Sequence, residues 1–122
     1  MILGIGTDLL DVARMARELA KEGAGLRDTV FTPAEISYCE GKRHPARHFA
    51  ARFAAKEAFY KALGGAGGAW REIEVENAST GPPRLVLHGS AREAADRRGV
   101  HAVLLSLSHT DGLAMASVVL QG

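Results

Sequence analysis

The sequence predicts an α+β fold in a single domain over residues 1–122, in which helices pack against a mainly antiparallel sheet. The first observation is the order of the expected elements: one strand, three helices, two strands, one helix and two strands. The second is a Thr-Asp-Gly turn between two apolar runs near the C-terminus, which is a hairpin signal. The third is a length of 122 residues without an internal repeat, which favours one domain.

The N-terminal half is expected to hold one strand and three helices. Residues 2–10, ILGIGTDLL, suit a buried strand, and Asp11 is a suitable N-cap for a helix that ends near Gly23. Thr32 is expected to cap the next helix, because proline follows it and glutamate stands three residues after it. The longest helix is expected over 45–63. The GGAGG that follows reads as a C-cap and linker, since it lacks the strand and GK[ST] of a P-loop.

The C-terminal half changes to mostly strand-forming segments. REIEVEN (71–77) and RLVLHG (84–89) are expected to be strands joined by a turn. A short helix is expected over 90–99, with its first serine as the cap. HAVLLSLSHT (101–110) and LAMASVVLQ (113–121) are expected to form the closing hairpin.

Composition excludes several classes of protein. The net charge of +1 and isoelectric point near 8.0 argue against a broad nucleic-acid-binding surface. Apolar runs fall short of the roughly 20 residues that span a bilayer, and the first residues lack the basic start of a signal peptide. Cys39 is the single cysteine, so we expect a buried free thiol rather than a disulfide or zinc site. We therefore expect a cytoplasmic protein with no membrane or nucleic-acid partner, small enough to favour an assembly of several chains.

Charged residues stand at the centre of the longest expected helix. At about 100° per residue, its aromatic and leucine side chains form one apolar stripe, and its alanines form a second, small-residue face. The stripe comprises Phe49, Phe53, Tyr60 and Leu63, and the alanine face comprises Ala51, Ala54, Ala55, Ala58 and Ala62. Glu57 and Lys61 lie in the gap between these surfaces. They form either an i,i+4 ion pair worth about 0.2–0.5 kcal/mol or part of a ligand site, and periodicity alone leaves both interpretations open. Lys56 is interpreted as a snorkelling side chain.

Asp8, after the apolar ILGIGT, is a second candidate site residue. A carboxylate there is costly to bury unless it is paired, hydrogen-bonded or bound to a metal. Asp8 is either a turn acid or, together with Glu57, one of two oxygen ligands for Mg²⁺. This ion often takes one or two protein carboxylates and fills its octahedron with waters and phosphate oxygens. The lysines and arginines nearby would then favour a phosphate-bearing ligand.

SLSHT at 106–110 is a third candidate. Its hydroxyls and imidazole lie near a strand end, where they could hold a phosphate or a ribose. A single histidine of this kind is more often structural, and adjacency in sequence does not define a catalytic triad. The segment therefore adds a binding candidate and no reaction of its own.

These segments together resemble the short form of the 4′-phosphopantetheinyl transferase family, the holo-acyl-carrier-protein synthases. The resemblance rests on GIGTDLLDVARM (4–15), RFAAKEAFYKALG (52–64), W-x-x-I-E-V (70–75), GPPRLVL (81–87) and SLSHT (106–110), in the order of the family's blocks. It covers essentially the whole chain. The KEAxxK block alone is moderately specific, and the blocks in order make the match strong.

The resemblance implies an enzyme that moves the 4′-phosphopantetheine arm of coenzyme A onto a serine of an apo acyl carrier protein. The other product would be adenosine 3′,5′-bisphosphate, and the reaction would depend on Mg²⁺. The carriers would serve fatty-acid or polyketide biosynthesis, and the sequence leaves open which. The resemblance also implies an α+β fold and a homotrimer with an active site at each subunit interface.

The same resemblance assigns residues. Asp8 and Glu57 match the family's Mg²⁺ ligands, and Lys61 matches the lysine near the pyrophosphate, so these three are the catalytic candidates. The positions that match those lining coenzyme A are Arg52, Phe53, Lys61, Gly64, Gly65, Pro83, Arg84, His109 and Thr110. The carrier-binding candidates on the helix after the first strand are Arg14, Arg17 and Lys21.

The chemistry leaves the general base open. A serine hydroxyl that attacks a phosphoanhydride needs neutralised charge on the leaving phosphate, in-line positioning and an acceptor for its proton. Glu57 could help to take the proton, and Asp111 is an alternative that the family pattern does not support. Two other functions remain to be weighed: a non-enzymatic coenzyme A-binding subunit, and a structural oligomeric domain with incidental charges. The presence of Asp8, Glu57 and Lys61 together favours the enzyme.

Overall fold

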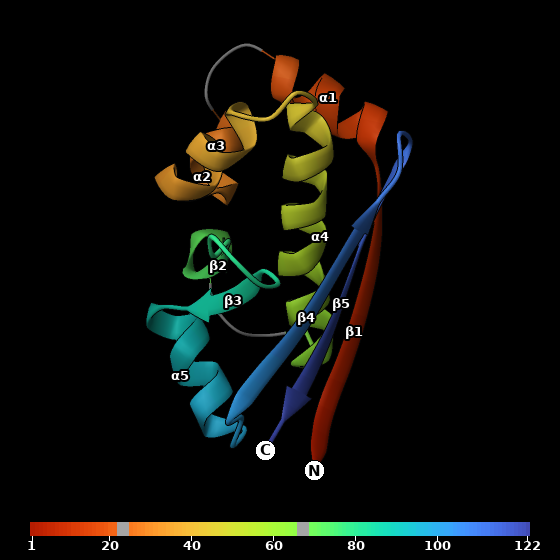
Figure 1. The fold of residues 1–122 in the computed structure, drawn as a ribbon. Helices are drawn as coiled ribbons and strands as arrows, with labels where there is room; N and C mark the ends of the chain where they lie inside the picture. Colours follow the sequence, from red (N-terminus) through yellow and green to blue (C-terminus); the bar gives the residue numbers. More distant parts are fainter. Residues whose placement is uncertain (22–24, 66–68) are drawn as a thin grey trace.

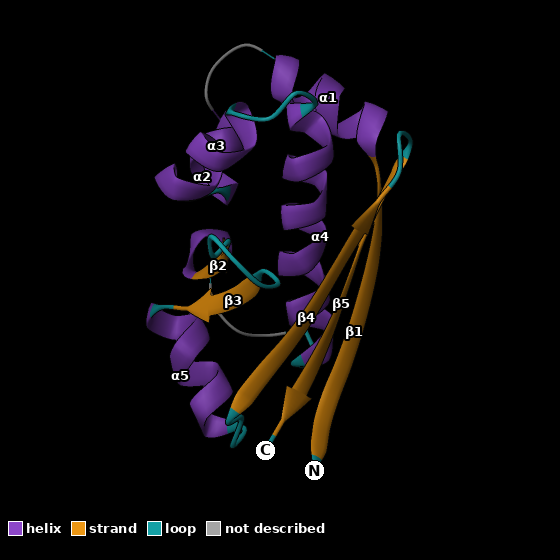
Figure 2. Ribbon diagram, viewed as in Figure 1, coloured by secondary structure: helices purple, strands orange, loops and turns teal. Residues whose placement is uncertain are grey.

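A computed structural model describes residues 1–21, 25–65 and 69–122 of the chain, and it has the expected α+β architecture (Figures 1 and 2). A three-stranded sheet lies on one side, and the long helix α4 runs along it. The elements in chain order are β1 (Ile2–Asp11), α1 (Val12–Ala20), α2 (Gly25–Val30), α3 (Pro33–Glu40), α4 (Pro45–Ala62), the 3₁₀ helix η1 (Trp70–Glu72), β2 (Ile73–Glu76), β3 (Arg84–Leu87), α5 (Gly89–Arg97), β4 (Ala102–His109) and β5 (Leu113–Gln121).

The strands form two antiparallel sheets. The larger has the order β1-β5-β4, so the first strand of the chain pairs with the last, and the smaller is the β2-β3 ribbon. In the larger sheet Asp8 lies opposite Ala116, and His109 lies opposite Ala114. The closing hairpin is confirmed, with the Thr110 hydroxyl accepting hydrogen bonds from the amides of Gly112 and Leu113. The prediction of mainly antiparallel pairing is therefore confirmed.

Helix α4 packs unusually closely on β1. Gly4 and Gly6 lie against it, and a Cβ added at these positions would overlap the carbonyl oxygens of Ala62 and Ala58, respectively. The alanine face of α4 is buried in this contact, as the sequence predicts. Since small residues on both elements allow the backbones to approach, Asp8 at the end of GIGTD is held beside the middle of α4.

Three local expectations were wrong. Helix α2 was not expected, because Gly25–Val30 is too short to show a clear amphipathic period. Residues 70–72 form a 3₁₀ helix, so β2 begins only at Ile73. Ser90 is not the cap of α5: the helix begins at Gly89, and its exposed amides are satisfied from outside by Glu72, whose Oε2 accepts from the Ser90 amide at 3.1 Å. The expected end of the first helix near Gly23 lies outside the described residues.

Candidate active site

The catalytic candidates gather at an open groove between β1, α1 and α4. The groove has a volume of about 490 Å³. It is lined by Asp8, Leu9, Leu10, Asp11, Arg14, Met15, Glu18, Leu26, Phe53 and Glu57. The N-terminal segment that contains β1, α1 and Leu26, together with the distant α4, thus contributes acidic, basic and apolar side chains to one surface.

Asp8 and Lys61 are joined across the contact between β1 and α4. The Lys61 ammonium donates to Asp8 Oδ1 at 2.8 Å and to the Thr7 carbonyl at 3.0 Å. The Lys61 side chain remains 53% exposed, whereas that of Asp8 is 14% exposed. The hydrogen bond and charge of Asp8 raise the pKa of Lys61, so this lysine is held as a cation at the edge of the groove. Lys61 thus pairs with Asp8 rather than with Glu57 among the described residues, and its role as a site lysine stays a prediction.

Glu57 lies between this pair and an aromatic wall. Burial raises the pKa of its carboxyl, the charge of Asp8 raises it further, and the charge of Lys61 opposes the shift. Phe53 precedes Glu57 by four residues and lines the same groove. Two carboxylates that share a groove and repel each other form a place where a bound cation would be stabilising.

The aromatic wall is built from three rings. Trp70 from η1 packs edge-on against Phe53, with ring centroids 5.2 Å apart, and against Tyr60, with centroids 4.9 Å apart. On α4, Phe53 lies four residues before Glu57 and Tyr60 lies three after it, so both neighbour Glu57 on the helix surface. Glu57 is half-buried beside them. The sequence grouped Phe53 and Tyr60 with the core stripe, and nothing in it placed Trp70 against them.

The carrier-binding candidates lie on α1 and at its C-cap, and one of them belongs to the same groove. Arg14 lines the groove, its amide is bonded to the N-cap Asp11 at 3.0 Å, and its side chain is exposed. Arg17 is also exposed, and Lys21 pairs with Glu18 at 3.0 Å. Met15 faces inward and is buried. The α1 surface therefore combines positive charge with an adjoining apolar floor.

The nucleotide candidates lie elsewhere in the chain. Arg52 is 2% exposed, donates to the His48 carbonyl at 3.2 Å and to Asn77, and stacks on Tyr38 with its guanidinium carbon 4.2 Å from the ring centre. It stands five residues before Glu57, which is about 140° around the helix, so the two side chains point in different directions.

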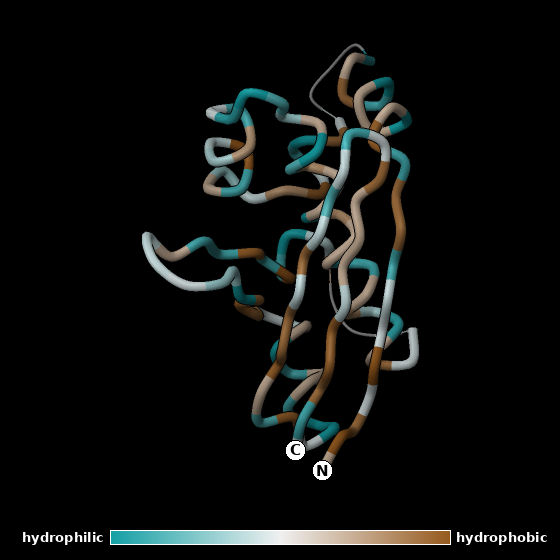
Figure 3. The backbone as a smooth tube through the Cα atoms, turned by 45° about the vertical axis from the view of Figure 1, so that its right-hand side comes forward, coloured by the Kyte–Doolittle hydropathy of each residue, from teal (hydrophilic) through white to brown (hydrophobic). Residues whose placement is uncertain are grey.

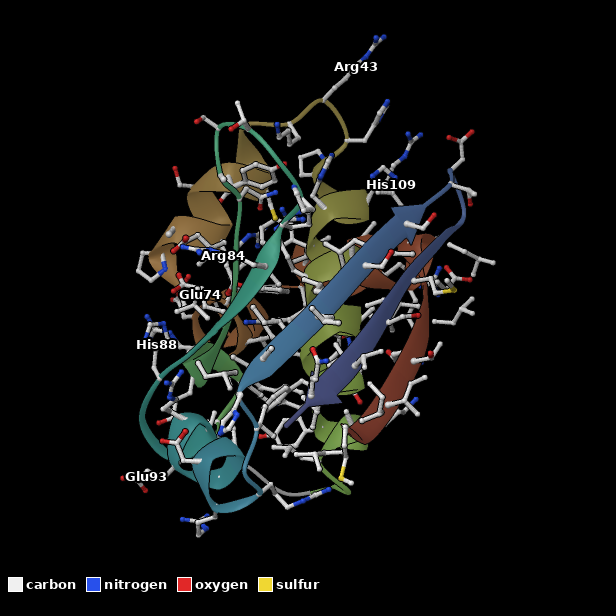
Figure 4. All side chains as sticks on the ribbon, turned by 60° about the horizontal axis from the view of Figure 1, so that its bottom comes forward. Arg43, Glu74, Arg84, His88, Glu93 and His109 are labelled. Atoms are coloured by element: carbon white, nitrogen blue, oxygen red, sulfur yellow. The ribbon has the colours of Figure 1, made fainter. Side chains whose placement is uncertain are left out.

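His109 ends β4, and Thr110 begins the hairpin turn. Both lie far along the sheet from the C-terminal end of α4. The His109 ring packs on His48 with centroids 5.2 Å apart. His48 precedes Glu57 by nine residues, about 13 Å along the helix axis. Figure 4 shows His109 at the end of β4, on the same side of the molecule as Arg43. Asp111, the alternative base, is paired with Arg47 at 2.7 Å in this region and not with the groove residues.

The remaining coenzyme A candidates occupy two further places. Arg84 begins β3 and pairs with Glu76 at 2.7 Å, and the half-buried Pro83 precedes it (Figure 4). Gly64 and Gly65 follow the end of α4 and have φ angles of 85° and 92°, which favour glycine. The rest of GGAGG, residues 66–68, lies outside the described part. Within one chain, the structure joins Asp8, Glu57, Lys61, Phe53 and Arg14, and leaves the nucleotide candidates apart from them.

The interpretation of Lys56 as a snorkelling side chain was wrong. Its ammonium is fully buried and donates to Glu35 Oε1 at 2.8 Å, to the Ile73 carbonyl at 2.6 Å and to the Trp70 carbonyl at 3.1 Å. Lys56 reaches these acceptors because its α4 position faces α3 and β2 rather than solvent. Glu35 was recognised only as part of the capping box with Thr32, which the structure confirms.

Comparisons with known proteins agree with this architecture. A model of the 4′-phosphopantetheinyl transferase superfamily matches residues 4–118. A holo-[acyl-carrier-protein] synthase of Geotalea daltonii is 44% identical over 124 residues, which cover 99% of each chain. The crystal structure of the holo-[acyl-carrier-protein] synthase of Neisseria meningitidis is 33% identical and covers 100% of both chains with a TM-score of 0.90. That of Helicobacter pylori, in complex with coenzyme A, is 28% identical and covers 96% of this chain and 99% of that one with a TM-score of 0.83.

The fold, the KEAxxK helix and the full-length matches define a transferase class. The chain belongs to the 4′-phosphopantetheinyl transferase superfamily. Among the residues that the structure describes, no helix is long and apolar enough to cross a membrane.

Proposed function

We infer that this chain is a holo-[acyl-carrier-protein] synthase, which transfers the 4′-phosphopantetheine arm of coenzyme A to a serine of an apo acyl carrier protein. The observation that carries this inference is the meeting of Asp8 from β1 with Lys61 from α4 at the groove that Glu57 lines. Relatives that match the full length bear this name, and one of them was solved with coenzyme A bound.

The groove suits a divalent cation held by two carboxylates. Asp8 and Glu57 would hold Mg²⁺, which requires few protein ligands when phosphate oxygens and waters complete its octahedron. The described residues contain no cluster of three or more metal-ligating side chains, which fits an ion shared with its substrate rather than a closed protein cage. When bound, Mg²⁺ would neutralise negative charge on the pyrophosphate of coenzyme A.

The reaction is a displacement at phosphorus. The serine oxygen bonds to the phosphorus that carries the pantetheine arm, the bridging P–O bond of the pyrophosphate breaks, and adenosine 3′,5′-bisphosphate leaves with the electron pair. The serine proton must pass to a base, and we propose as its acceptor Glu57, which lines the groove and could act directly or through a metal-bound water. Lys61 stabilises charge on the pyrophosphate by exchanging its exposed contact with Asp8 for a phosphate oxygen.

A homotrimer with active sites between subunits would bring the separated candidates together. One face of the β1-β5-β4 sheet packs on α4, and apolar residues run along these strands (Figure 3). Large apolar side chains on the strands are exposed: Ile2, Ile5, Leu9, Leu104, Leu113 and Met115. Exposed apolar area of this kind favours burial against another chain. His109 and Thr110 of one subunit would then complete the groove of a neighbour.

The assembly is tested by sedimentation at micromolar concentration. We expect a trimer for the native protein and a monomer for an Ile5→Lys/Leu104→Lys variant. Both native side chains are exposed and apolar, and a lysine in their place would put a charge in the proposed interface. Glu93→Lys, at an exposed position on α5 away from His109 (Figure 4), is the control for added positive charge and stays trimeric. A monomeric native protein that is fully active would contradict interfacial sites.

The carrier protein is expected to dock on α1. Arg14 lines the groove, and the exposed Arg17 and Lys21 follow it by three and seven residues, so the three can present positive charge from one side of the helix to an acidic partner. Replacing Arg14 by Glu should raise KM for the carrier and weaken the inhibition by salt, with a smaller effect on kcat. An unchanged KM would mean that the carrier docks elsewhere.

The function is tested by mixing the protein with Mg²⁺, coenzyme A and apo carrier protein and measuring the carrier's mass. We expect the added mass of one phosphopantetheine group, and its loss in Glu57→Gln, in Asp8→Asn and on chelation of the metal. Fatty-acid and polyketide carriers should be compared in parallel. Absence of the adduct on every carrier would contradict the transferase, whereas binding of coenzyme A without transfer would favour a binding subunit.

A further inference from the structure

The Lys56–Glu35 pair is the most completely satisfied polar group of the described core. Both side chains are buried with 0% exposure. The ammonium has three oxygen acceptors, while Glu35 accepts from the amides of Thr32 at 2.9 Å and Val75 at 2.9 Å in addition to Lys56. Burying such a pair is costly, and replacing it by apolar residues is often neutral for stability. Stability alone therefore does not account for a buried ion pair at this place.

The pair joins α4, which carries Glu57, to elements that do not line the groove. Lys56 lies on α4, Glu35 on α3, and the acceptor carbonyls belong to Trp70 of η1 and Ile73 of β2. Three segments that are separated in sequence, α4, α3 and the consecutive η1 and β2, thus meet at one ammonium group. Because a lysine at this point directs three hydrogen bonds, it sets both the rotation of α4 and its distance from η1.

The order of side chains around α4 shows what this contact controls. Taking Glu57 as the origin and about 100° per residue, Lys61 lies about 40° to one side, and Phe53 and Tyr60 lie about 40° and 60° to the other. Lys56 lies about 100° away on that second side. Glu57 is therefore flanked by the Asp8–Lys61 pair on one side and by the aromatic wall on the other, with Lys56 behind the wall.

Trp70 connects the buried lysine to that wall. Its carbonyl accepts from Lys56, and its ring packs on Phe53 and Tyr60. We propose that Lys56, held by Glu35, is a positioning residue that fixes Trp70 against Phe53 and Tyr60, and thereby directs Glu57 into the groove toward Asp8. The proposal rests on the transferase function inferred above. Lys56 itself touches none of the reacting atoms.

The test uses Trp70, the single tryptophan of the chain, as an optical probe of the wall. The variant Lys56→Met/Glu35→Leu removes both charges together, so it avoids leaving one buried charge unpaired. We expect it to unfold cooperatively, with Trp70 emission shifted to longer wavelength and quenched more strongly by acrylamide. We expect kcat for transfer to fall by at least about tenfold, because small displacements of a catalytic group are costly. KM for the carrier should stay within about twofold, since α1 is untouched.

Leu120→Ala is the matched control. Leu120 is buried on β5, in the core cluster against which Tyr60 packs, but it is none of the three rings of the wall. We expect its truncation to destabilise the fold while changing Trp70 emission and kcat less than the double variant does. Should the double variant fail to fold, Glu35→Gln decides the question by the same two readouts. Unchanged emission, or a kcat within about twofold of the native value despite changed emission, would overturn the proposal. A native protein without transfer activity would overturn the proposed function, while the Trp70 readout would still report whether Lys56 fixes the wall.

Discussion

Two lysines of α4 make ion pairs of equal length in opposite surroundings. Lys56 lies 2.8 Å from Glu35 with both side chains fully buried, whereas Lys61 lies 2.8 Å from Asp8 with its side chain 53% exposed. The geometry of the contact is the same, and the cost of breaking it is not. Removal of one buried partner leaves an unpaired charge in the core, whereas the exposed pair can exchange its contact with water or with a ligand.

The difference separates structural from functional charge on one helix. Burial lowers the pKa of Lys56, against the opposing charge of Glu35, so this cation persists only while its partners stay in place. The hydrogen bond and charge of Asp8 raise the pKa of Lys61, and burial lowers this pKa by less. The role proposed for Lys61, to hold a pyrophosphate in one step and release it in the next, requires the second environment.

The largest expected effect is on the buried pair. We expect Lys56→Met alone to lower the free energy of unfolding by about 3–5 kcal/mol, because Glu35 stays buried without its cation. Urea denaturation followed by circular dichroism measures this. Glu35→Leu added to the same variant should recover part of the loss, because it removes the unpaired charge but also the acceptor of the Thr32 and Val75 amides. A single variant that loses less than about 1 kcal/mol would show that water or another group reaches Glu35.

The next effect tests the close contact that places Asp8 beside α4. We expect Gly6→Ala to lower the free energy of unfolding by about 1–3 kcal/mol and to reduce transfer, because the new Cβ would overlap the Ala58 carbonyl and push β1 away. Gly25→Ala is the control, since a Cβ there meets nothing within 4 Å. Equal stability of the two variants in thermal unfolding would contradict the role of this contact.

Loss of the exposed Lys61–Asp8 pair should affect transfer activity strongly and stability little. We expect Lys61→Met to change the free energy of unfolding by less than about 1 kcal/mol. Transfer activity should nevertheless fall by about 100-fold, as when one electrostatic group is lost from an active site. Arg92→Met, which breaks another exposed ion pair on α5, should leave both quantities near the native values. A Lys61 variant with full activity would assign the lysine to the structure alone.

The smallest effect concerns acid stability near His48. Burial lowers the pKa of His48 to about 4, helped by the positive charges of Arg52, His109, Lys42 and Arg47. The unfolded chain therefore binds a proton at His48 more readily than the folded chain does. The stability that the neutral His48 contributes to the fold is present above about pH 6.5 and is lost as the pH falls from there to about 4. In His48→Phe the decline of unfolding free energy over that range should be shallower. Identical slopes in urea titrations at each pH would contradict the shift.

Much of the fold was predictable because its signals are local. The Thr32-Pro33 start of α3, the Thr-Asp-Gly hairpin and the period of α4 depend on residues close together in the chain, and the structure agrees with each. Helix α2 was not predicted, because its six residues are too few to show an amphipathic period. The cap of α5 was misassigned because its partner, Glu72, comes from another element.

The sequence alone determined the α+β order, the two faces of α4 and the candidates Asp8, Glu57 and Lys61, because residue spacing and motif resemblance carry that information. Tertiary structure alone decided which charges are paired. Glu57 and Lys61 are neighbours on the helix, yet Lys61 pairs with Asp8, and Lys56 pairs with Glu35 from α3. The reason is physical: whether a charge is buried, and which partner lies within hydrogen-bond reach, depends on how β1 and α3 pack on α4, and no spacing along one helix encodes that packing.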